Sequence, residues 1–227
     1  MSSSVQVSLW CWRLDGPDDE RDSLEAALSP PERERAGRFV FDDHRRDYIF
    51  AHGRMRQLLG GLLGVAAKDV GFVHNEHDKP TLAGNELFFN LSHAGGYAAL
   101  AVSSDVDLGV DIERLRPIEP GLSERFFSRR ENRSLASLDG DDWLAGFFRI
   151  WTGKEAVVKA IGLGLSVDLS SFDIDIGADQ GCAVLPSDEA DHPRRRLRYK
   201  RFPVDAAVIG CVAVCADREI EIVRQGF

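Results

Sequence analysis

Two long helical segments, each accompanied by several short strands, constrain the fold of this chain more than any other feature. The spacing of apolar residues predicts helices over residues 42–63 and 141–161. Short segments with strand-like patterns surround both helices, and the change from one half to the other falls at residues 103–108. There is no sequence repeat and no long linker between the halves. The pattern therefore predicts an α/β chain of the α+β type, in which each half packs helices on a small, mostly antiparallel sheet.

The remaining elements follow from local signals. A hydroxyl, two prolines and an acidic residue at Ser29, Pro30, Pro31 and Glu32 predict the start of another helix. One or two helices are expected over residues 122–138. Strands are expected over residues 5–12, 70–73, 87–91, 97–103, 108–112, 172–176, 181–185, 196–202, 207–215 and 219–223.

Charge and cysteine content exclude several classes of protein. The chain has 28 Lys and Arg against 37 Asp and Glu, a net charge of −9, which disfavours a general nucleic-acid binder. Four scattered cysteines do not form a disulfide scaffold. Residues 206–216 are the longest nearly uncharged apolar stretch and are too short to span a bilayer, and the N-terminus does not resemble a signal peptide. We expect a soluble, cytoplasmic, reduced protein that binds neither membranes nor nucleic acid.

A pair of carboxylates in a strand is the first candidate for chemistry. In Gly109-Val110-Asp111-Ile112-Glu113, the two acids lie two residues apart and point to the same face, while Val110 and Ile112 face the core. Hard oxygen ligands at this spacing suit Mg²⁺. The alternative is a solvated strand end with nearby arginines as counter-charges, and taken alone this alternative is favoured.

A second pair lies in the long helix of the C-terminal half. Glu155 and Lys159 are four residues apart and share one helix face. The carboxylate could complete a metal site or act as a base, and the ammonium could meet an oxyanion. The alternative is a surface ion pair, but the many apolar residues of this helix favour a cleft or an interface.

Residues 89–96, Phe-Asn-Leu-Ser-His-Ala-Gly-Gly, combine a strand with a turn that could bind an anion through backbone N–H groups and polar side chains. Adjacent residues of a strand diverge, so Ser92 and His93 are not a nucleophile pair. A capped turn with a structural histidine is equally compatible with the pattern. His74 and His77 lack a third zinc ligand at a suitable spacing.

Taken together, these segments resemble the Sfp-type 4′-phosphopantetheinyl transferases. Six motifs occur in the family's order: SPPERERAGRF at 29–39, DKPTL at 78–82, FNLSHAGG at 89–96, GVDIERLRP at 109–117, RFFSRRE at 125–131 and WTGKEAVVKAIGLGL at 151–165. The resemblance implies a pseudo-twofold pair of similar halves with the active site in the cleft between them. It implies an N-terminal half at 1–105 on the coenzyme A nucleotide side and a C-terminal half at 106–227 that carries the metal carboxylates and the carrier-protein docking surface.

The resemblance also implies a reaction and residue roles. The 4′-phosphopantetheine arm of coenzyme A would be transferred to a serine of an acyl or peptidyl carrier protein, as in secondary metabolite biosynthesis, releasing adenosine 3′,5′-bisphosphate. Mg²⁺, or Mn²⁺ in its place, would be held by Asp111, Glu113 and Glu155. Glu155, Lys159 and Asp111 would be catalytic. The coenzyme would be bound by Arg35, His74, Lys79, Ser92, His93, Lys154 and Lys159.

The expected docking surface for the carrier consists of Phe126, Phe127, Arg129, Arg130 and Leu135. Two departures from the family pattern, Asp78 and Glu32, place negative charge where the coenzyme phosphates are expected. We expect a monomer, because the two halves already form the cleft. The alternatives are a Mg²⁺-dependent nuclease or phosphohydrolase and a non-catalytic coenzyme A-binding module. The carrier, its pathway and the tolerance for acylated coenzyme A stay open.

Overall fold

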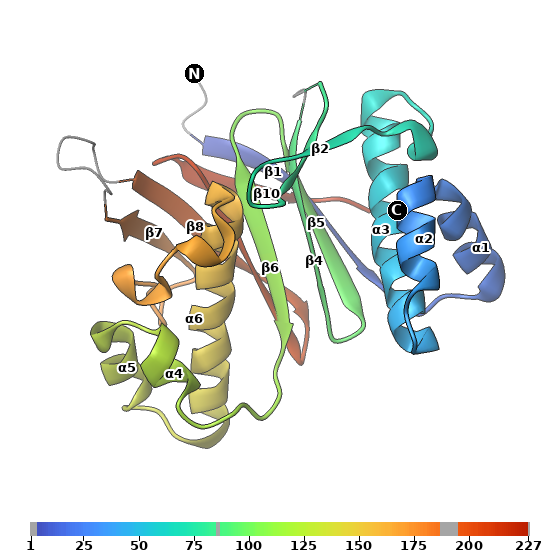
Figure 1. Ribbon diagram of the computed structural model, residues 1–227. Helices are drawn as coiled ribbons and strands as arrows, with labels where there is room; N and C mark the ends of the chain where they lie inside the picture. The colour runs from blue at the N-terminus through green and yellow to red at the C-terminus, as the bar shows by residue number, and fades with distance from the viewer. Residues whose placement is uncertain (1–3, 85–86, 187–194, 227) are drawn as a thin grey trace.

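Two four-stranded sheets lie face to face, and each is covered on its outer side by helices (Figure 1). The computed structural model describes residues 4–84, 87–186 and 195–226. The first sheet has the order β10-β1-β5-β4 and the second has the order β6-β9-β8-β7. Strand bounds are β1 Ser4–Arg13, β4 Phe88–Ala94, β5 Tyr97–Ser103, β6 Leu108–Arg114, β7 Gln180–Leu185, β8 Arg195–Asp205, β9 Val208–Val214 and β10 Glu219–Arg224.

The helices follow the same division into halves. Three belong to the N-terminal half: α1 (Asp18–Ala27), α2 (Pro30–Gly37) and α3 (Asp42–Leu63). Three belong to the C-terminal half: α4 (Leu122–Phe126), α5 (Arg129–Leu135) and α6 (Gly140–Ile161). A small hairpin of β2 (Phe72–His74) and β3 (Pro80–Leu82) follows α3, and short 3₁₀ turns lie at Ala67–Asp69, Gly164–Ser166 and Leu169–Ser171.

Three apolar clusters explain why these layers stay together. One lies between the first sheet and α1–α3, a second between the second sheet and α4–α6, and a third between the two sheets. Val110 and Ile112 of β6 belong to the third cluster, as their strand parity predicts. The expected fold of two halves with helices on small, mostly antiparallel sheets is confirmed.

One strand crosses between the halves. β10 comes from the end of the described chain, yet it pairs in parallel with β1, from Ser4 opposite Glu219 to Leu9 opposite Arg224. All other pairs in the two sheets are antiparallel. The sheet of the N-terminal half is therefore completed by residues from the opposite end of the sequence.

Most elements lie where the sequence predicts them. The helix at 42–63 and the strand at 97–103 have the predicted bounds, and the capping box at Ser29 and Glu32 starts α2. The prediction of a strand at 172–176 is wrong, because the structure describes these residues and they do not form a strand. Phe172 and Ile174 are buried, so the alternating pattern is real, but this extended segment does not join a sheet. Helix α1 is missed because its sequence is mostly charged.

Among the described residues, no helix combines the length and the apolar character needed to cross a membrane.

Gly109 determines how closely α6 approaches β6. A Cβ atom at this position would collide with backbone atoms of Ala156, Lys159 and Ala160. Any side chain would push the helix away from the strand, and with it the residues that α6 presents to Asp111 and Glu113.

We expect Gly109→Ala to lower the free energy of unfolding by about 2 kcal/mol or more, because backbone atoms cannot move aside as a flexible side chain can. Urea denaturation measures this. The matched control is Gly61→Ala in α3, where an added Cβ meets nothing within 4 Å; it should leave stability unchanged or raise it slightly. Equal effects of the two changes would contradict the close contact described here.

Candidate active site

The site begins at β4 and β6. These are the edge strands of the two sheets, and they lie next to each other. Two buried polar side chains of β4 accept hydrogen bonds from the free backbone edge of β6. Val110 N–H donates to Asn90 Oδ1 (2.9 Å), and Ile112 N–H donates to Ser92 Oγ (3.3 Å). These bonds satisfy donors that no strand pairs with, and they fix Ser92 opposite Asp111.

Asp111 is the centre of the polar network that results. Its Oδ1 accepts hydrogen bonds from Lys159 Nζ (2.6 Å) and from Ser92 Oγ (3.1 Å). Its Oδ2 is buried and has no hydrogen-bond partner in the described part of the chain. Burial raises the pKa of Asp111, and the Lys159 ammonium lowers it. A buried carboxylate oxygen without a partner has unused capacity to bind a cation or a donor.

Glu113 and Glu155 lie beside Asp111, on β6 and α6. Burial raises the pKa of each carboxyl, and the negative charge of Asp111 raises both further. Lys159 acts in the opposite direction on both. The three carboxyl groups line one cavity, where their negative charges repel one another. A divalent cation bound between them would reduce this repulsion.

The donor set therefore fits a hard cation in its chemistry. As the side chains stand, however, no three His, Cys, Asp or Glu residues of the described ranges are close enough together to hold a metal ion. The cation that now contacts Asp111 is the ammonium of Lys159.

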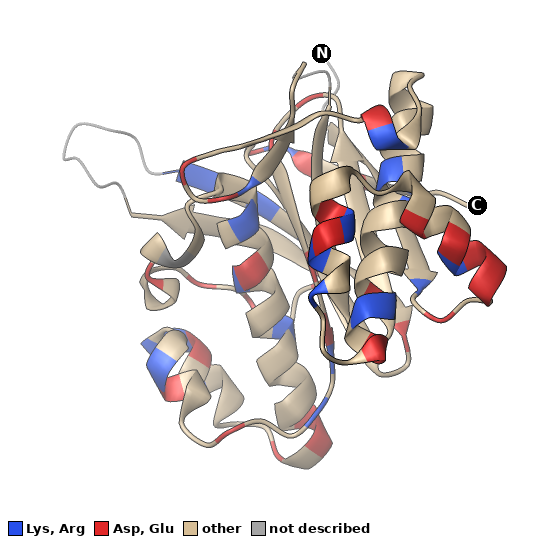
Figure 2. Cartoon of the chain, turned by 45° about the vertical axis from the view of Figure 1, so that its right-hand side comes forward, with Lys and Arg blue, Asp and Glu red and all other residues tan. Residues whose placement is uncertain are grey.

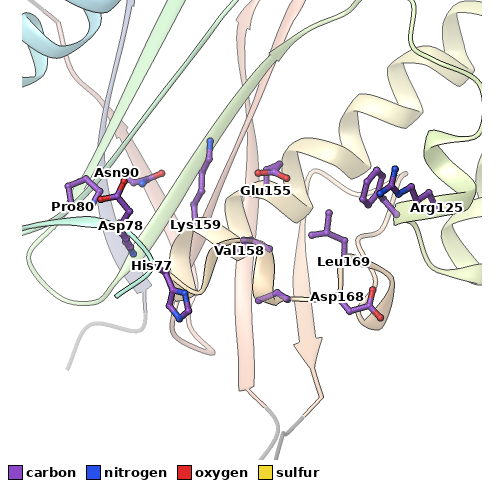
Figure 3. A pocket seen from close by; sticks show the side chains of 15 residues that line it. His77, Asp78, Pro80, Asn90, Arg125, Glu155, Val158, Lys159, Asp168 and Leu169 are labelled. Carbon is purple, nitrogen blue, oxygen red and sulfur yellow. The ribbon is translucent and has the colours of Figure 1, made fainter. Parts of the chain in front are cut away.

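Two hollows meet at Glu155 and Lys159, which line both of them. The first, which we call the carboxylate cavity, measures about 590 Å³ and is lined by polar residues that include Ser92, His93, Asp111, Glu113, Arg114 and Arg116. The second, which we call the hairpin cavity, measures about 440 Å³. It lies between residues 77–80 and a more apolar wall of Phe126, Val158, Val167 and Leu169. Figure 3 shows Lys159 and Glu155 between the hairpin residues and Leu169.

Comparisons with known proteins agree with this architecture. Residues 107–212 match the family model of the 4′-phosphopantetheinyl transferase superfamily, and residues 17–105 match that of the N-terminal region of 4′-phosphopantetheinyl transferases. The 4′-phosphopantetheinyl transferase HetI of Nostoc sp. is 41% identical over 169 residues, covering 72% of this chain and 71% of the relative. The chain belongs to the 4′-phosphopantetheinyl transferase family.

Two further relatives show the breadth of this family. The 4′-phosphopantetheinyl transferase Sfp of Bacillus subtilis is 29% identical over 200 residues, covering 87% of this chain and 86% of the relative. The L-aminoadipate-semialdehyde dehydrogenase-phosphopantetheinyl transferase of mouse is 30% identical over 189 residues, covering 72% of this chain and 60% of the relative. The resemblance to Sfp-type transferases is confirmed.

The structure of this transferase brings together only some of the residues that we predicted to bind the coenzyme. Ser92, His93 and Lys159 line the carboxylate cavity. Ser92 is buried and His93 is exposed. Arg35 and His74 are exposed on α2 and β2, and the two cavities described above do not include them. The Arg35 guanidinium lies 5.5 Å from the centre of the Tyr48 ring.

The prediction that Lys154 binds coenzyme phosphates is wrong. Its side chain is fully buried and forms an ion pair of 2.9 Å with Glu131, which is also buried. Its ammonium donates to the carbonyl oxygens of Leu169 (2.6 Å) and Phe172 (2.7 Å). Lys154 thus ties α6 to α5 and to the wall of the hairpin cavity, and its ammonium cannot reach a ligand in either cavity.

Lys79 also departs from its predicted role. Its Nζ donates to Asp107 Oδ1 (2.8 Å), Leu108 O (3.2 Å) and Ala160 O (2.9 Å). An ammonium has three donors, and all three are used within the protein. The prediction that Lys79 contacts a phosphate therefore does not hold in this structure.

The predicted docking surface is only partly at the surface. Phe127 and Leu135 are buried in the core of the C-terminal half, so their assignment to a docking surface is wrong. Phe126 is half-buried at the hairpin cavity, whereas Arg129 and Arg130 are exposed. On α5, Glu131 and Leu135 are buried, whereas Arg129, Arg130 and Arg133 are exposed.

Sequence analysis missed Asn90, although it lies two residues before Ser92 on the same strand and so must share its face. The two-residue period of the strand could therefore have predicted that Asn90 lies on the same face as Ser92. It also missed Glu131, whose role depends on a partner 23 positions along the chain.

We expect Lys154→Met to lower the free energy of unfolding by about 3–5 kcal/mol, because it leaves the Glu131 carboxylate buried without a counter-charge. Chemical denaturation measures the change. The double variant Lys154→Met/Glu131→Gln removes that charge and should recover part of the loss, whereas Lys68→Met, at an exposed position, should have little effect. A loss below about 1 kcal/mol for Lys154→Met would exclude the structural role.

Proposed function

We propose that this transferase moves the 4′-phosphopantetheine arm of coenzyme A to a serine hydroxyl of an acyl or peptidyl carrier protein. The observation that carries the proposal is the position of Glu155 and Lys159 at the junction of two cavities of different character. The bond to be broken lies within the pyrophosphate, which joins the uncharged pantetheine portion of coenzyme A to its highly charged nucleotide. A junction between a polar and a more apolar cavity suits such a substrate.

In this arrangement the arm would lie in the hairpin cavity against Val158, Val167 and Leu169. The pyrophosphate would lie in the carboxylate cavity, where Lys159, Arg114 and Arg116 supply positive charge. The reacting phosphorus would then be next to Glu155 and Lys159. The N-terminal half would face the nucleotide, and the C-terminal half would receive the carrier.

Glu155 is the candidate base. Burial and two neighbouring carboxylates raise the pKa of its carboxyl, which makes the group a better proton acceptor than an exposed glutamate. It would take the proton from the carrier serine, whose oxygen forms a bond to the pantetheine-side phosphorus as the bond to the leaving phosphate breaks. Adenosine 3′,5′-bisphosphate leaves, and Lys159 would stabilise its new negative charge.

Asp111, Glu113 and Glu155 would hold the divalent cation, Mg²⁺ or Mn²⁺, with the unpartnered Oδ2 of Asp111 as one ligand. Such a cation would neutralise charge on the pyrophosphate. Lys159 would then exchange its contact with Asp111 for one with the coenzyme. We also propose that the protein acts as a monomer, since one chain supplies the residues on both sides of the junction between the two cavities.

We expect that, with coenzyme A and Mg²⁺, the protein adds the mass of one phosphopantetheine group to an apo carrier protein, and that a chelator abolishes the gain. Glu155→Gln should slow transfer at least about 100-fold, because it removes the proton acceptor and keeps the shape. Intact-mass spectrometry of the carrier measures both rates. Glu119→Gln, at an exposed position, is the matched control and should leave the rate unchanged.

The outcomes separate the alternative functions. Coenzyme A binding without transfer to any carrier of a broad panel would favour a binding module. Cleavage of nucleic acid without a carrier would favour a nuclease. Near-normal transfer by Glu155→Gln would remove Glu155 from the role of base.

We propose that the carrier protein docks on Arg129 and Arg130 of α5, which are exposed, and on Phe126 at the hairpin cavity. The carboxylate of Asp173 lies 3.8 Å from Arg130, a weak contact that leaves this guanidinium largely exposed. Figure 2 shows acidic and basic residues interspersed along the helices, so a basic surface for an acidic carrier would be local.

We expect Arg129→Glu/Arg130→Glu to raise the KM for the carrier at least several-fold and to leave the KM for coenzyme A unchanged, because reversed charges repel an acidic partner. Steady-state kinetics with each substrate varied separately measures the difference. The control is the reversal of two other exposed arginines, Arg38 at the C-cap of α2 and Arg195 on β8. An unchanged carrier KM for the α5 variant, or an equal rise in the control, would reject this surface.

A further inference from the structure

The β2–β3 hairpin ends in a turn that is organised by one side chain. Asn75 Oδ1 accepts hydrogen bonds from the N–H groups of His77 and Lys79, both at 2.9 Å. The backbone adds bonds from Asp78 N to Asn75 O (3.0 Å) and from Asn75 N to Lys79 O (3.1 Å). These four bonds hold the turn together, and the turn includes His77 and Asp78, which line the hairpin cavity.

This turn is fastened to the C-terminal end of α6. Asn75 Nδ2 donates to Gly162 O (2.9 Å), and Lys79 Nζ donates to Ala160 O (2.9 Å). The last carbonyls of a helix have no partner within the helix, so these contacts satisfy groups that would otherwise need water. Lys79 also binds Asp107 and Leu108 at the start of β6. One ammonium thus joins the hairpin of the N-terminal half to two elements of the C-terminal half.

Gly162 makes the contact possible. It ends α6 with a φ of 69°, in the left-handed region. A Cβ atom there would lie 2.9 Å from Lys79 Cδ and 3.0 Å from Asn75 Nδ2. The conformation and the close approach of the hairpin both require glycine at this position.

We propose that Lys79 is a positioning residue that holds the hairpin on the end of α6, so that the hairpin forms one wall of the coenzyme cavity. The inference rests on the proposed function of that cavity. His77, Asp78 and Pro80 line it from the hairpin, and Val158 and Leu169 line it from the C-terminal half, as Figure 3 shows. Without the lysine, the hairpin loses its only charged link to α6 and β6 among the described contacts.

Direct binding of a phosphate by Lys79 is the competing explanation, and Asp107 distinguishes the two. If Lys79 holds the hairpin, removal of the Asp107 carboxylate loosens the hairpin and weakens coenzyme binding. If Lys79 binds phosphate, the same removal frees the ammonium, and coenzyme binding is unchanged or tighter. Asp107 itself does not line either cavity as described.

The experiment measures the Kd of coenzyme A by calorimetry, and KM and kcat with a carrier, for Lys79→Met, Lys79→Arg and Asp107→Ala in the full chain. We expect each change to raise Kd and KM about 10-fold with kcat within about 2-fold, and Lys79→Met/Asp107→Ala to be no worse than Lys79→Met alone. Arginine should fail to replace lysine, because its planar fork does not fit three acceptors around one point. Faster amide hydrogen exchange over residues 75–79 reports release of the hairpin directly.

Two exposed residues provide controls: Lys68→Met, and Asp105→Ala, which removes an ion pair with Arg218; both should behave like the wild type. Full affinity in Asp107→Ala with loss in Lys79→Met, or full affinity in Lys79→Arg, would overturn the proposal in favour of a phosphate ligand. Unchanged affinity in all variants would overturn it outright. Calorimetry needs no carrier, so a missing transfer activity would leave this test intact.

Discussion

The meeting of β4 and β6 is the contact on which the site depends. Both are edge strands, and an edge strand presents unpaired backbone groups. Here β9 pairs with one edge of β6, and no strand of the described residues pairs with the other edge. Asn90 and Ser92 of β4 accept its N–H groups through their side chains. The spacing of β6 from β4 is therefore set by side chains, and this leaves room for Asp111 to bond to Ser92 and Lys159 within the junction.

Helix α6 supplies the other half of the constraint. It lies directly on β6 because Gly109 has no side chain. Contacts also hold α6 in place on both sides of the segment that carries Glu155 and Lys159. Lys154 ties it to α5 and to the segment around Leu169, and the hairpin caps its last turn. Glu155 and Lys159 lie between these two fastenings. Their positions relative to Asp111 are consequently determined by buried contacts, which is the arrangement that keeps charged side chains in a fixed geometry.

Sequence reasoning worked where a rule of local geometry decides the answer. The two-residue period of a strand placed Asp111 and Glu113 on one face, and helix spacing placed Glu155 and Lys159 together. It failed where the answer depends on a distant partner. A lysine in a motif does not reveal whether its ammonium meets a ligand or the protein, and Lys154 and Lys79 both meet the protein. Phe127, which follows α4, and Leu135, which ends α5, were misplaced because such short helices give too few turns to distinguish the buried face from the exposed one.

The parallel pairing of β10 with β1 has a consequence for synthesis. The first sheet needs residues 219–224 beside residues 4–9, so its outer edge stays open while the intervening chain is being made. The N-terminal half cannot finish folding on the ribosome ahead of the C-terminal half, as independent domains do. The first sheet is complete only after β10 emerges. A truncation that removes β10 shortens the C-terminal half, but the strand edge that it exposes is that of β1 in the N-terminal half.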